Sequence, residues 1–277
     1  MKKNLVIGTI SIIVVVAMAA ILLSYEKSLD EAIMYLKGAN YWILLLLIPN
    51  VILMYYAAGR IWYPYLKNDG ISADELGRIQ YELNFVNTVV PTATISGLIY
   101  ATKRLKAYGI DGGRTAWLYL YRYVVSIVTN WLGIVGSAII LLCLGKMKDM
   151  PMLPLVITAA IVCLAVAGFV IAIFLLVSKI GSGTFVDNLH TALKFAAENK
   201  TALVSSWIWG MIYTIMEDLP FLIVAWSMGH PELFLQMVVA AGAGIIVGIF
   251  MPTPGGIGGF EGAMIYLLGG FNTNIAL

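Results

Sequence analysis

Charged side chains are scarce in this sequence: of its 277 residues, 12% are Asp, Glu, Lys or Arg and 61% are hydrophobic. Such a composition excludes an ordinary soluble core with a polar surface. The sequence therefore predicts an all-α polytopic membrane protein. The formal net charge of +2 is small, and no nucleic-acid binding is expected.

Cysteine and histidine are rarer still, with two residues of each. Cys143 and Cys163 lie within apolar runs and lack the spacing of metal ligands, which indicates helix packing rather than a disulfide or a zinc site. His190 and His230 have no Ser or Cys of a catalytic triad around them and are interpreted as surface residues. The sequence predicts no metal, no cofactor and no catalytic residue.

Long apolar runs are what the sequence has instead, and about 20 apolar residues are needed to cross a bilayer as a helix. Most basic residues fall on the same side of these runs as Lys2 and Lys3, which predicts a cytoplasmic N-terminus. After the second span comes the stretch Arg60–Arg78, which is polar and basic. Residues 1–277 are expected to form a single transmembrane domain. The predicted spans are Leu5–Leu23, Tyr41–Ala58, Thr115–Leu144, Leu153–Val177 and Leu203–Met228.

Proline and glycine interrupt two further apolar stretches. Val90–Gly97 and Met251–Gly258 both read apolar-Pro-Thr, followed by small residues and glycine. Proline removes a backbone donor and glycine releases the chain from helical dihedral angles, so the backbone breaks and leaves polar groups that lipid cannot satisfy. This pattern indicates a protein-walled cavity at membrane depth; the alternative is a surface loop between two spans. The predicted hinge positions are Pro91, Gly97, Pro252, Pro254, Gly255, Gly256 and Gly258.

The two broken stretches are expected to enter the membrane from opposite sides. Arg78 precedes the run Phe85–Ala101 and Lys103 follows it, so both ends of this segment should be cytoplasmic and the segment re-entrant. The second stretch follows the fifth span and is entered from outside. Two re-entrant segments in inverted orientation are typical of transporters with a site at the bilayer midplane.

Four ionisable residues at membrane depth, Arg122, Glu217, Asp218 and Glu261, are candidate ligands for a lipid headgroup, because charges there are costly and mark function or partnered structure. Glu217 and Asp218 are about 100° apart on a helix and need not face one cavity. An alternative is an Arg122–carboxylate pair that only holds helices together. Glu261 is expected in the first turn of a returning half-helix, as a cap or as a headgroup ligand.

Tryptophans near the ends of the predicted spans suggest an interfacial belt. Trp42 and Trp226 are expected near the outer face, and Trp62 and Trp117 near the inner face. Glu82, just before the first broken stretch, is interpreted as a solvated cytoplasmic carboxylate.

The stretch Pro252–Gly262 resembles the Pro-x-Pro-Gly-Gly-hydrophobic-Gly-x-x-Glu signature of the lysylphosphatidylglycerol synthase transmembrane region. Asn87–Pro91, Ser96-Gly97 and Lys103-Arg104 are similar to earlier elements of that family. The resemblance implies a flippase-type bundle with re-entrant helices in a bacterial cell membrane. Family members form the membrane part of the multiple peptide resistance factor, which moves lysylated phosphatidylglycerol to the outer leaflet and protects against cationic peptides.

Two departures from the family pattern bear on function. The soluble acyltransferase-like domain that aminoacylates the lipid is absent from this sequence, and the sequence stops at Asn272–Leu277 where relatives continue into at least one more span. The second departure leads us to expect a C-terminally truncated fragment.

The leading hypothesis is a phospholipid translocase, with lysyl-phosphatidylglycerol as its lipid. Half-helix N-termini and Arg122 would attract the phosphate, and Glu217, Asp218 or Glu261 would meet the cationic headgroup. The alternatives are the membrane part of a phosphatidylglycerol lysyltransferase and a non-transporting regulatory subunit. The expected partners are the phospholipid and the bilayer, with homo-oligomerisation left open.

Overall fold

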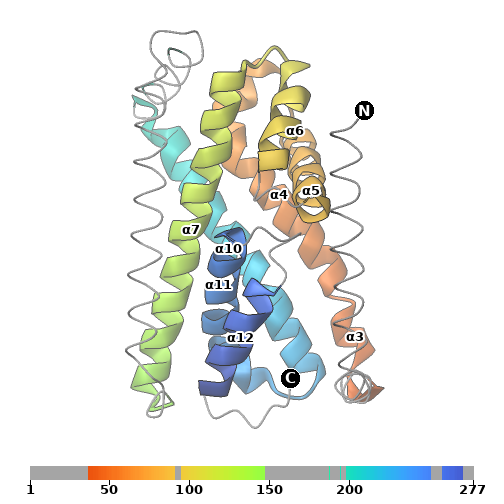
Figure 1. The fold of residues 1–277 in the computed structure, drawn as a ribbon, viewed down its shortest axis with the longest axis vertical. Helices are drawn as coiled ribbons and strands as arrows, with labels where there is room; N and C mark the ends of the chain where they lie inside the picture. The colour runs from red at the N-terminus through yellow and green to blue at the C-terminus, as the bar shows by residue number, and fades with distance from the viewer. Residues whose placement is uncertain are drawn as a thin grey trace, which may run out of the picture.

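The computed structural model describes residues 37–90, 95–146, 198–250 and 258–270, together with Asp187 and Lys194, and every regular element in these ranges is helical. α4, α7 and α10 run along the long axis of the molecule (Figure 1). The elements are α3 (Tyr41–Leu44), α4 (Leu47–Leu66), η1 (Lys67–Asp69), α5 (Ala73–Val89), α6 (Ile95–Lys106), α7 (Gly112–Cys143), α10 (Lys200–Ser227), η2 (Pro231–Leu233), α11 (Phe234–Phe250) and α12 (Gly259–Gly270).

Four helical segments are long and apolar enough to cross a membrane: Tyr41–Asp69, Gly112–Cys143, Lys200–Ser227 and Pro231–Gly248. The first three correspond to the predicted second, third and fifth spans, so an all-α polytopic fold is confirmed. The other two predicted spans, Leu5–Leu23 and Leu153–Val177, lie outside the described residues.

The second span is longer than predicted. α4 does not end at Ala58 but continues through Arg60 to Leu66, and α5 begins at Ala73. The predicted end of the second span at Ala58 is therefore wrong. The physical reason is the spacing of the apolar residues between the charges, which recurs every three or four positions and forms a buried helical face. The buried residues of this face include Ala58, Ile61, Trp62, Tyr65 and Leu66.

Helix ends follow local capping rules. Asp111 accepts a hydrogen bond from the Arg114 backbone N–H at 2.9 Å at the start of α7, and Asn199 caps α10 through the Ala202 N–H at 3.1 Å. At the end of α10, Gly229 has a φ of 86°, and the following His230 N–H donates to the Ala225 carbonyl at 2.8 Å. This left-handed glycine closes a Schellman-type cap and turns the chain toward α11.

Two pairs of helices occupy opposite halves of the molecule. α5 and α6 pack together in the upper half of Figure 1, and α11 and α12 pack together in the lower half. The start of α5 contacts the chain just after α6, through Glu75 and Tyr108, and the end of α5 contacts the start of α6, through Asn87 and Gly97, so these helices are antiparallel. The start of α5 and the end of α6 therefore lie at the same end of the molecule.

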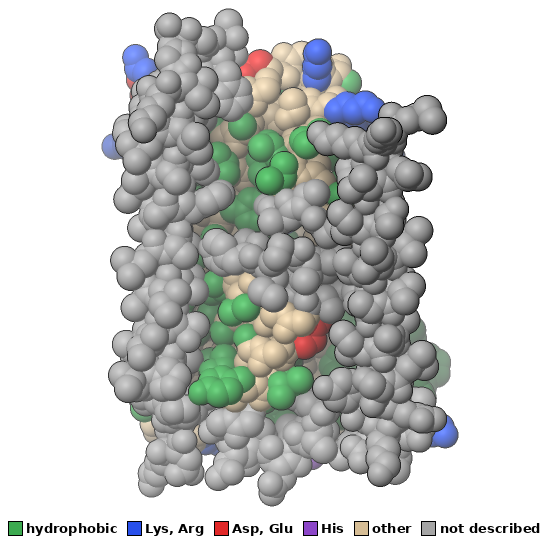
Figure 2. All heavy atoms as spheres, viewed as in Figure 1, with side chains coloured by type: hydrophobic (Ala, Val, Ile, Leu, Met, Phe, Trp, Pro, Cys, Tyr) green, Lys and Arg blue, Asp and Glu red, His purple; other side chains and the backbone are tan. Residues whose placement is uncertain are grey.

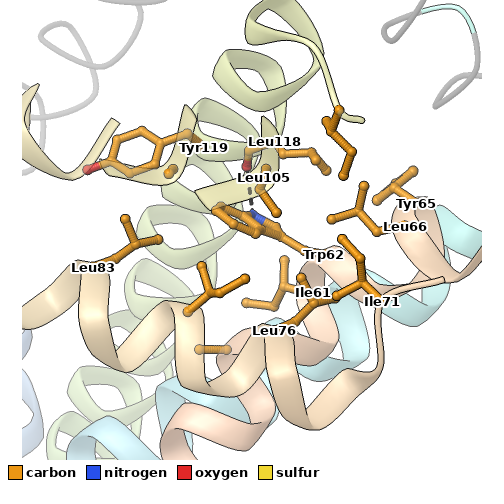
Figure 3. Packing of buried hydrophobic residues seen from close by; sticks show 14 of the residues in the cluster. Ile61, Trp62, Tyr65, Leu66, Ile71, Leu76, Leu83, Leu105, Leu118 and Tyr119 are labelled. Atoms are coloured by element: carbon orange, nitrogen blue, oxygen red, sulfur yellow. Dashed lines mark hydrogen bonds between the residues drawn. The ribbon is translucent and has the colours of Figure 1, made fainter. Parts of the chain in front are cut away.

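The largest apolar core lies between the upper pair and the long helices (Figure 3). Trp62 of α4 is at its centre, fully buried, and its indole N–H donates to the Leu118 carbonyl of α7 at 2.9 Å. Trp117 is only 6% exposed, so the expected inner belt of Trp62 and Trp117 is wrong. These rings are surrounded by several helices, which sequence position alone does not reveal. Trp42 and Trp226, in contrast, are 82% and 49% exposed.

Glycines allow close helix contacts at defined points. A Cβ on Gly59 of α4 would lie 2.4 Å from the Gly77 backbone nitrogen of α5, so these backbones pack directly against each other. A Cβ on Gly244 of α11 would lie 2.8 Å from the Phe260 carbonyl oxygen of α12. Both helix pairs are therefore positioned by contacts that only glycine permits.

Candidate functional site

Arg122 and Glu217 meet through a tyrosine in the middle of the bundle. Glu217 and Tyr213 lie one turn apart on α10, and the Tyr213 hydroxyl donates to Glu217 Oε1 at 2.8 Å. The Arg122 guanidinium of α7 donates to the same hydroxyl oxygen at 3.4 Å, and its Cζ lies 5.3 Å from the centroid of the Tyr213 ring. Within the described residues Arg122 forms no direct salt bridge. The expected Arg122–carboxylate contact is thus bridged by a hydroxyl.

This arrangement leaves unused hydrogen-bonding capacity. Arg122 Nε and Glu217 Oε2 are buried and have no hydrogen-bond partner in the described part of the chain. Tyr55 of α4 lies close enough to interact electrostatically with both residues, and Asn84 of α5 donates to its hydroxyl at 2.6 Å. A guanidinium N–H can donate to a phosphate and a carboxylate oxygen can accept from an ammonium, so the site offers one group for each charge.

Asp218 points away from this arrangement. Its side chain is 7% exposed, and its Oδ2 lies 3.7 Å from the position that a Cβ on Gly133 of α7 would occupy. Among the described residues its Oδ1 has no hydrogen-bond partner. The two adjacent carboxylates therefore face different surroundings, as their offset of about 100° around the helix allows.

Glu261 lies in the first turn of α12, as expected. Its Oε2 accepts a hydrogen bond from the Gly258 backbone N–H at 2.6 Å, while Gly258 has a φ of 89°. The carboxylate thus satisfies a donor that the start of the helix leaves free. Phe260 stacks on Phe221 of α10 at 6.2 Å between centroids, which places this helix start about one turn along α10 from Glu217.

The other predicted hinge positions have different outcomes. Gly97 lies inside the first turn of α6, where a Cβ would be 2.4 Å from Asn87 Oδ1 and 2.5 Å from the Tyr119 hydroxyl. Glycine provides room for these side chains there. The remaining positions, Pro91, Pro252, Pro254, Gly255 and Gly256, lie outside the described residues.

Asn87 organises the tip of the α5–α6 pair, a role that sequence reasoning missed. Its Oδ1 accepts from the Gly97 backbone N–H at 2.8 Å and from the Ser96 hydroxyl at 3.3 Å, and its amide donates to the Tyr119 hydroxyl of α7 at 3.1 Å. The available signal was an amide side chain placed just before a helix-breaking proline. Asn87 caps α6 and ties it to α7.

Glu82 is not a free surface carboxylate but part of a network between α5 and α6. Its Oε2 accepts from the Tyr100 hydroxyl at 2.8 Å and from Arg104 Nε at 3.0 Å, and Arg104 also binds Glu75 at 2.9 Å. Burial alone would raise the pKa of Glu82, but the hydrogen bonds from Tyr100 and Arg104 and the positive charge of Arg104 outweigh it and hold the pKa below its ordinary value. The interpretation as a solvated carboxylate missed these partners, although the side chain remains 30% exposed.

Metal chemistry has no candidate site here, because the described residues contain no group of three or more His, Cys, Asp or Glu that could hold an ion. The polar groups are instead distributed singly between long apolar helices. The fold therefore defines a polytopic helical membrane protein whose central charged residues keep unpaired polar atoms.

The chain belongs to the lysylphosphatidylglycerol synthase transmembrane-region family, whose model matches residues 8–276. This membership indicates a lipid-related function in a membrane. No curated protein matches the chain, and no solved structure does.

Proposed function

We propose that the protein is a phospholipid translocase whose lipid carries a cationic headgroup, such as lysyl-phosphatidylglycerol. The observation that carries this proposal is the pair of Arg122 and Glu217 held on either side of the Tyr213 hydroxyl, each with an unpaired polar atom. Buried charges are costly unless they are paired or bind a ligand. A cation and an anion that both keep an unpaired polar atom therefore suit a ligand that carries a negative and a positive group.

The headgroup of lysyl-phosphatidylglycerol carries one phosphate and two ammonium groups. We assign the phosphate to Arg122 and one ammonium to Glu217. The second ammonium would contact Glu261, whose Oε2 caps Gly258 while Oε1 remains for a ligand at an exposed position. Asp218 faces α7 at Gly133, about 100° around α10 from Glu217, and we do not assign it to the headgroup.

The two helix pairs supply a route between leaflets in this proposal. α5 has 17 residues and α6 has 12, which correspond to lengths of about 26 Å and about 18 Å, short of a hydrocarbon core of about 30 Å. α11 and α12 also have 17 and 12 residues. The second arms α6 and α12 are therefore too short to cross alone, whereas Pro231–Gly248, which contains most of α11, is long and apolar enough to cross. The short second arm of each pair supports re-entrant pairs that enter from opposite sides.

The orientation follows from charge. In Figure 2, Lys and Arg side chains gather mainly at the upper end of the molecule, above a band of apolar side chains. By the positive-inside rule we assign the upper end to the cytoplasm of a bacterial cell. The basic residues Lys2 and Lys3 independently favour a cytoplasmic N-terminus. Movement of a lysylated lipid to the outer leaflet would lower its negative surface charge and thereby protect the cell from cationic peptides.

Cysteine labelling tests this topology. Lys67→Cys and Lys106→Cys, each at an exposed position and made singly in a Cys143→Ser, Cys163→Ser background, flank the upper pair. Both should react with a membrane-impermeant reagent from the cytoplasmic side. Reaction from opposite sides would show that the α5–α6 segment crosses the membrane and would overturn the re-entrant assignment.

The function is tested with purified protein in vesicles that contain fluorescent lysyl-phosphatidylglycerol or fluorescent phosphatidylglycerol, with a quencher that reaches only the outer leaflet. The protein should speed exchange of the lysylated lipid above that in protein-free vesicles. Arg122→Met and Glu217→Gln should each slow it by about tenfold or more, the loss of a charge-assisted contact of about 1.5–3 kcal/mol. The control is Glu232→Gln at the exposed η2 turn.

Two results would overturn the proposal. Exchange no faster than in protein-free vesicles would exclude a translocase under these conditions and favour a non-transporting subunit. Formation of lysyl-phosphatidylglycerol from phosphatidylglycerol and lysyl-tRNA by the purified chain would favour the lysyltransferase instead.

A further inference from the structure

The charges in the middle of the bundle do not balance. Arg122 is the single cation among the described residues of this region, and it faces Glu217 through Tyr213, while Asp218 has no cationic partner. Among the described residues the charged group that acts on Asp218 is Glu217, its neighbour on α10. Arg122 is on α7 and Glu261 on α12, and α11 contains no titratable residue.

An independent observation lies beside Asp218. Asn130 of α7 is 3% exposed, and within the described part of the chain neither its amide nitrogen nor its amide oxygen has a hydrogen-bond partner. It precedes Gly133, whose Cβ position is 3.7 Å from Asp218 Oδ2, by about one turn of α7, and its Oδ1 lies 2.7 Å from the position of a Cβ on Gly242 of α11. The junction of α7, α10 and α11 therefore holds an unpaired carboxyl and an unpaired amide on the same face of α7.

Neighbouring hydroxyls do not serve these groups. Thr129 of α7 and Thr214 of α10 lie 2.7 Å apart and hydrogen-bond to each other, and Thr129 also donates within its own helix. Asp218 Oδ1 thus accepts no hydrogen bond in the described part of the chain, and an ionised Asp218 would lie next to the negative charge of Glu217. A buried carboxylate in such surroundings is costly, whereas a neutral carboxyl is not.

We propose that Asp218 is a proton-binding site that carries a proton in the resting protein and exchanges it at the α7–α10–α11 junction. A proton from water forms the O–H bond on one carboxyl oxygen of Asp218, and the reverse step returns it to water. We assign Asn130 as the positioning residue: after rotation of its side chain, the amide oxygen would accept from the protonated carboxyl and the amide nitrogen would donate to the ionised one. Gly242 has no Cβ and so leaves room for the Asn130 side chain.

A metal cation fits the junction less well than a proton. Hard cations take about six or more oxygen ligands, and among the described residues the unpartnered oxygens here are Asp218 Oδ1 and Asn130 Oδ1. The proton site also suggests an energy source for the proposed translocase, because exchange of this proton would couple lipid movement to a proton gradient. This coupling, unlike the proton site itself, rests on the proposed function.

Proton binding itself is tested without transport, by infrared difference spectroscopy of the full chain in vesicles. At neutral pH the wild type should show a protonated-carboxyl band that shifts in deuterium oxide and disappears at alkaline pH. Asp218→Asn should lack this band, and Glu217→Gln should keep it. A neutral-pH band that survives in Asp218→Asn, or no band in the wild type, would overturn the proposal.

Thermal stability against pH provides a second measurement. Because the folded state holds a proton that the unfolded chain releases near neutral pH, the Tm of the wild type should fall as pH rises. Asp218→Asn should lose this fall, whereas Gln80→Met should retain it, since Gln80 is equally buried and unpaired but neutral. A rise in Tm with sodium at constant pH would identify a sodium site instead.

Coupling is measured with the fluorescent lipid under an imposed pH gradient. A wild-type rate that responds to the gradient, and an Asp218→Asn rate that does not, would support coupling. If the infrared band is present but no lipid moves, the proton site stands and the translocase fails; if lipid moves without any response to the gradient, the translocase stands and the coupling fails.

Discussion

The upper helix pair and the middle of the bundle differ in how completely their polar groups are paired. In the upper part Arg104 is bound by Glu75 and Glu82, Arg114 forms a two-pronged ion pair with Asp69, and a large apolar core surrounds Trp62. The unpaired polar atoms there are few, mainly those of Gln80 and the Nε of Arg60.

The middle of the bundle has smaller apolar clusters and more unpaired groups. Arg122, Glu217, Asp218 and Asn130 each keep at least one buried atom without a partner. A fully paired network stiffens a structure, whereas unpaired buried groups cost stability unless a ligand uses them. The upper part is therefore interpreted as the scaffold and the middle as the place of exchange.

The largest expected effect comes from Trp62→Ala in the scaffold. Removal of this fully buried ring should lower the free energy of unfolding by about 3–5 kcal/mol, because a cavity remains where several helices meet. Trp42→Ala, at a residue that is 82% exposed, is the matched control and should change it little. Unfolding in mixed detergent measures both, and equal losses would contradict the assignment of Trp62 to the core.

The next largest effect is expected for Gly59→Ala. The added methyl group would lie against the Gly77 backbone, which cannot move aside as a flexible side chain would, and overpacking of this kind costs about 1–3 kcal/mol. Gly136→Ala in α7 is the control, since nothing lies within 4 Å of its Cβ position. A destabilised control with an unchanged Gly59 variant would refute the close packing of α4 on α5.

Glu82→Gln should have a smaller and pH-dependent effect of about 0.5–1 kcal/mol, given its partial exposure. The pKa of Glu82 is depressed in the folded state, so its contribution is present above the ordinary value of about 4.3 and is lost as pH falls through the folded value. The difference from the wild type should therefore vanish in acid. Glu198→Gln, in an exposed pair at 4.0 Å, should show no such dependence in the same thermal denaturation series.

The smallest effect on stability is expected for Glu261→Gln. Glutamine keeps an acceptor for the Gly258 N–H, so Tm should barely change, whereas Glu261→Ala removes the cap and should lower it measurably. The exchange assay should nevertheless show slower movement of the lysylated lipid, with little change for phosphatidylglycerol. Equal slowing of both lipids would leave Glu261 as a cap alone.

Several parts of the fold and site were predictable because their signals are local. The spans at Tyr41, Thr115 and Leu203 follow from apolar length, and the helix start near Glu261 follows from glycine and a carboxylate three residues after Gly258. The charged candidates Arg122 and Glu217 were evident as rare ionisable residues within apolar runs. The bridging role of Tyr213 was not evident from the sequence, because a tyrosine in a membrane helix has many ordinary roles.

The sequence by itself determined an all-α membrane fold, two breaks in apolar stretches and a short set of intramembrane charges, since hydropathy and helix breaking act along the chain. Only the tertiary structure decided that Trp62 is core rather than belt, and that Glu217 faces Arg122 while Asp218 faces Gly133 and Asn130. The physical reason is that burial and pairing depend on how each helix is rotated against its neighbours, and adjacent residues on one helix differ by about 100° in that rotation.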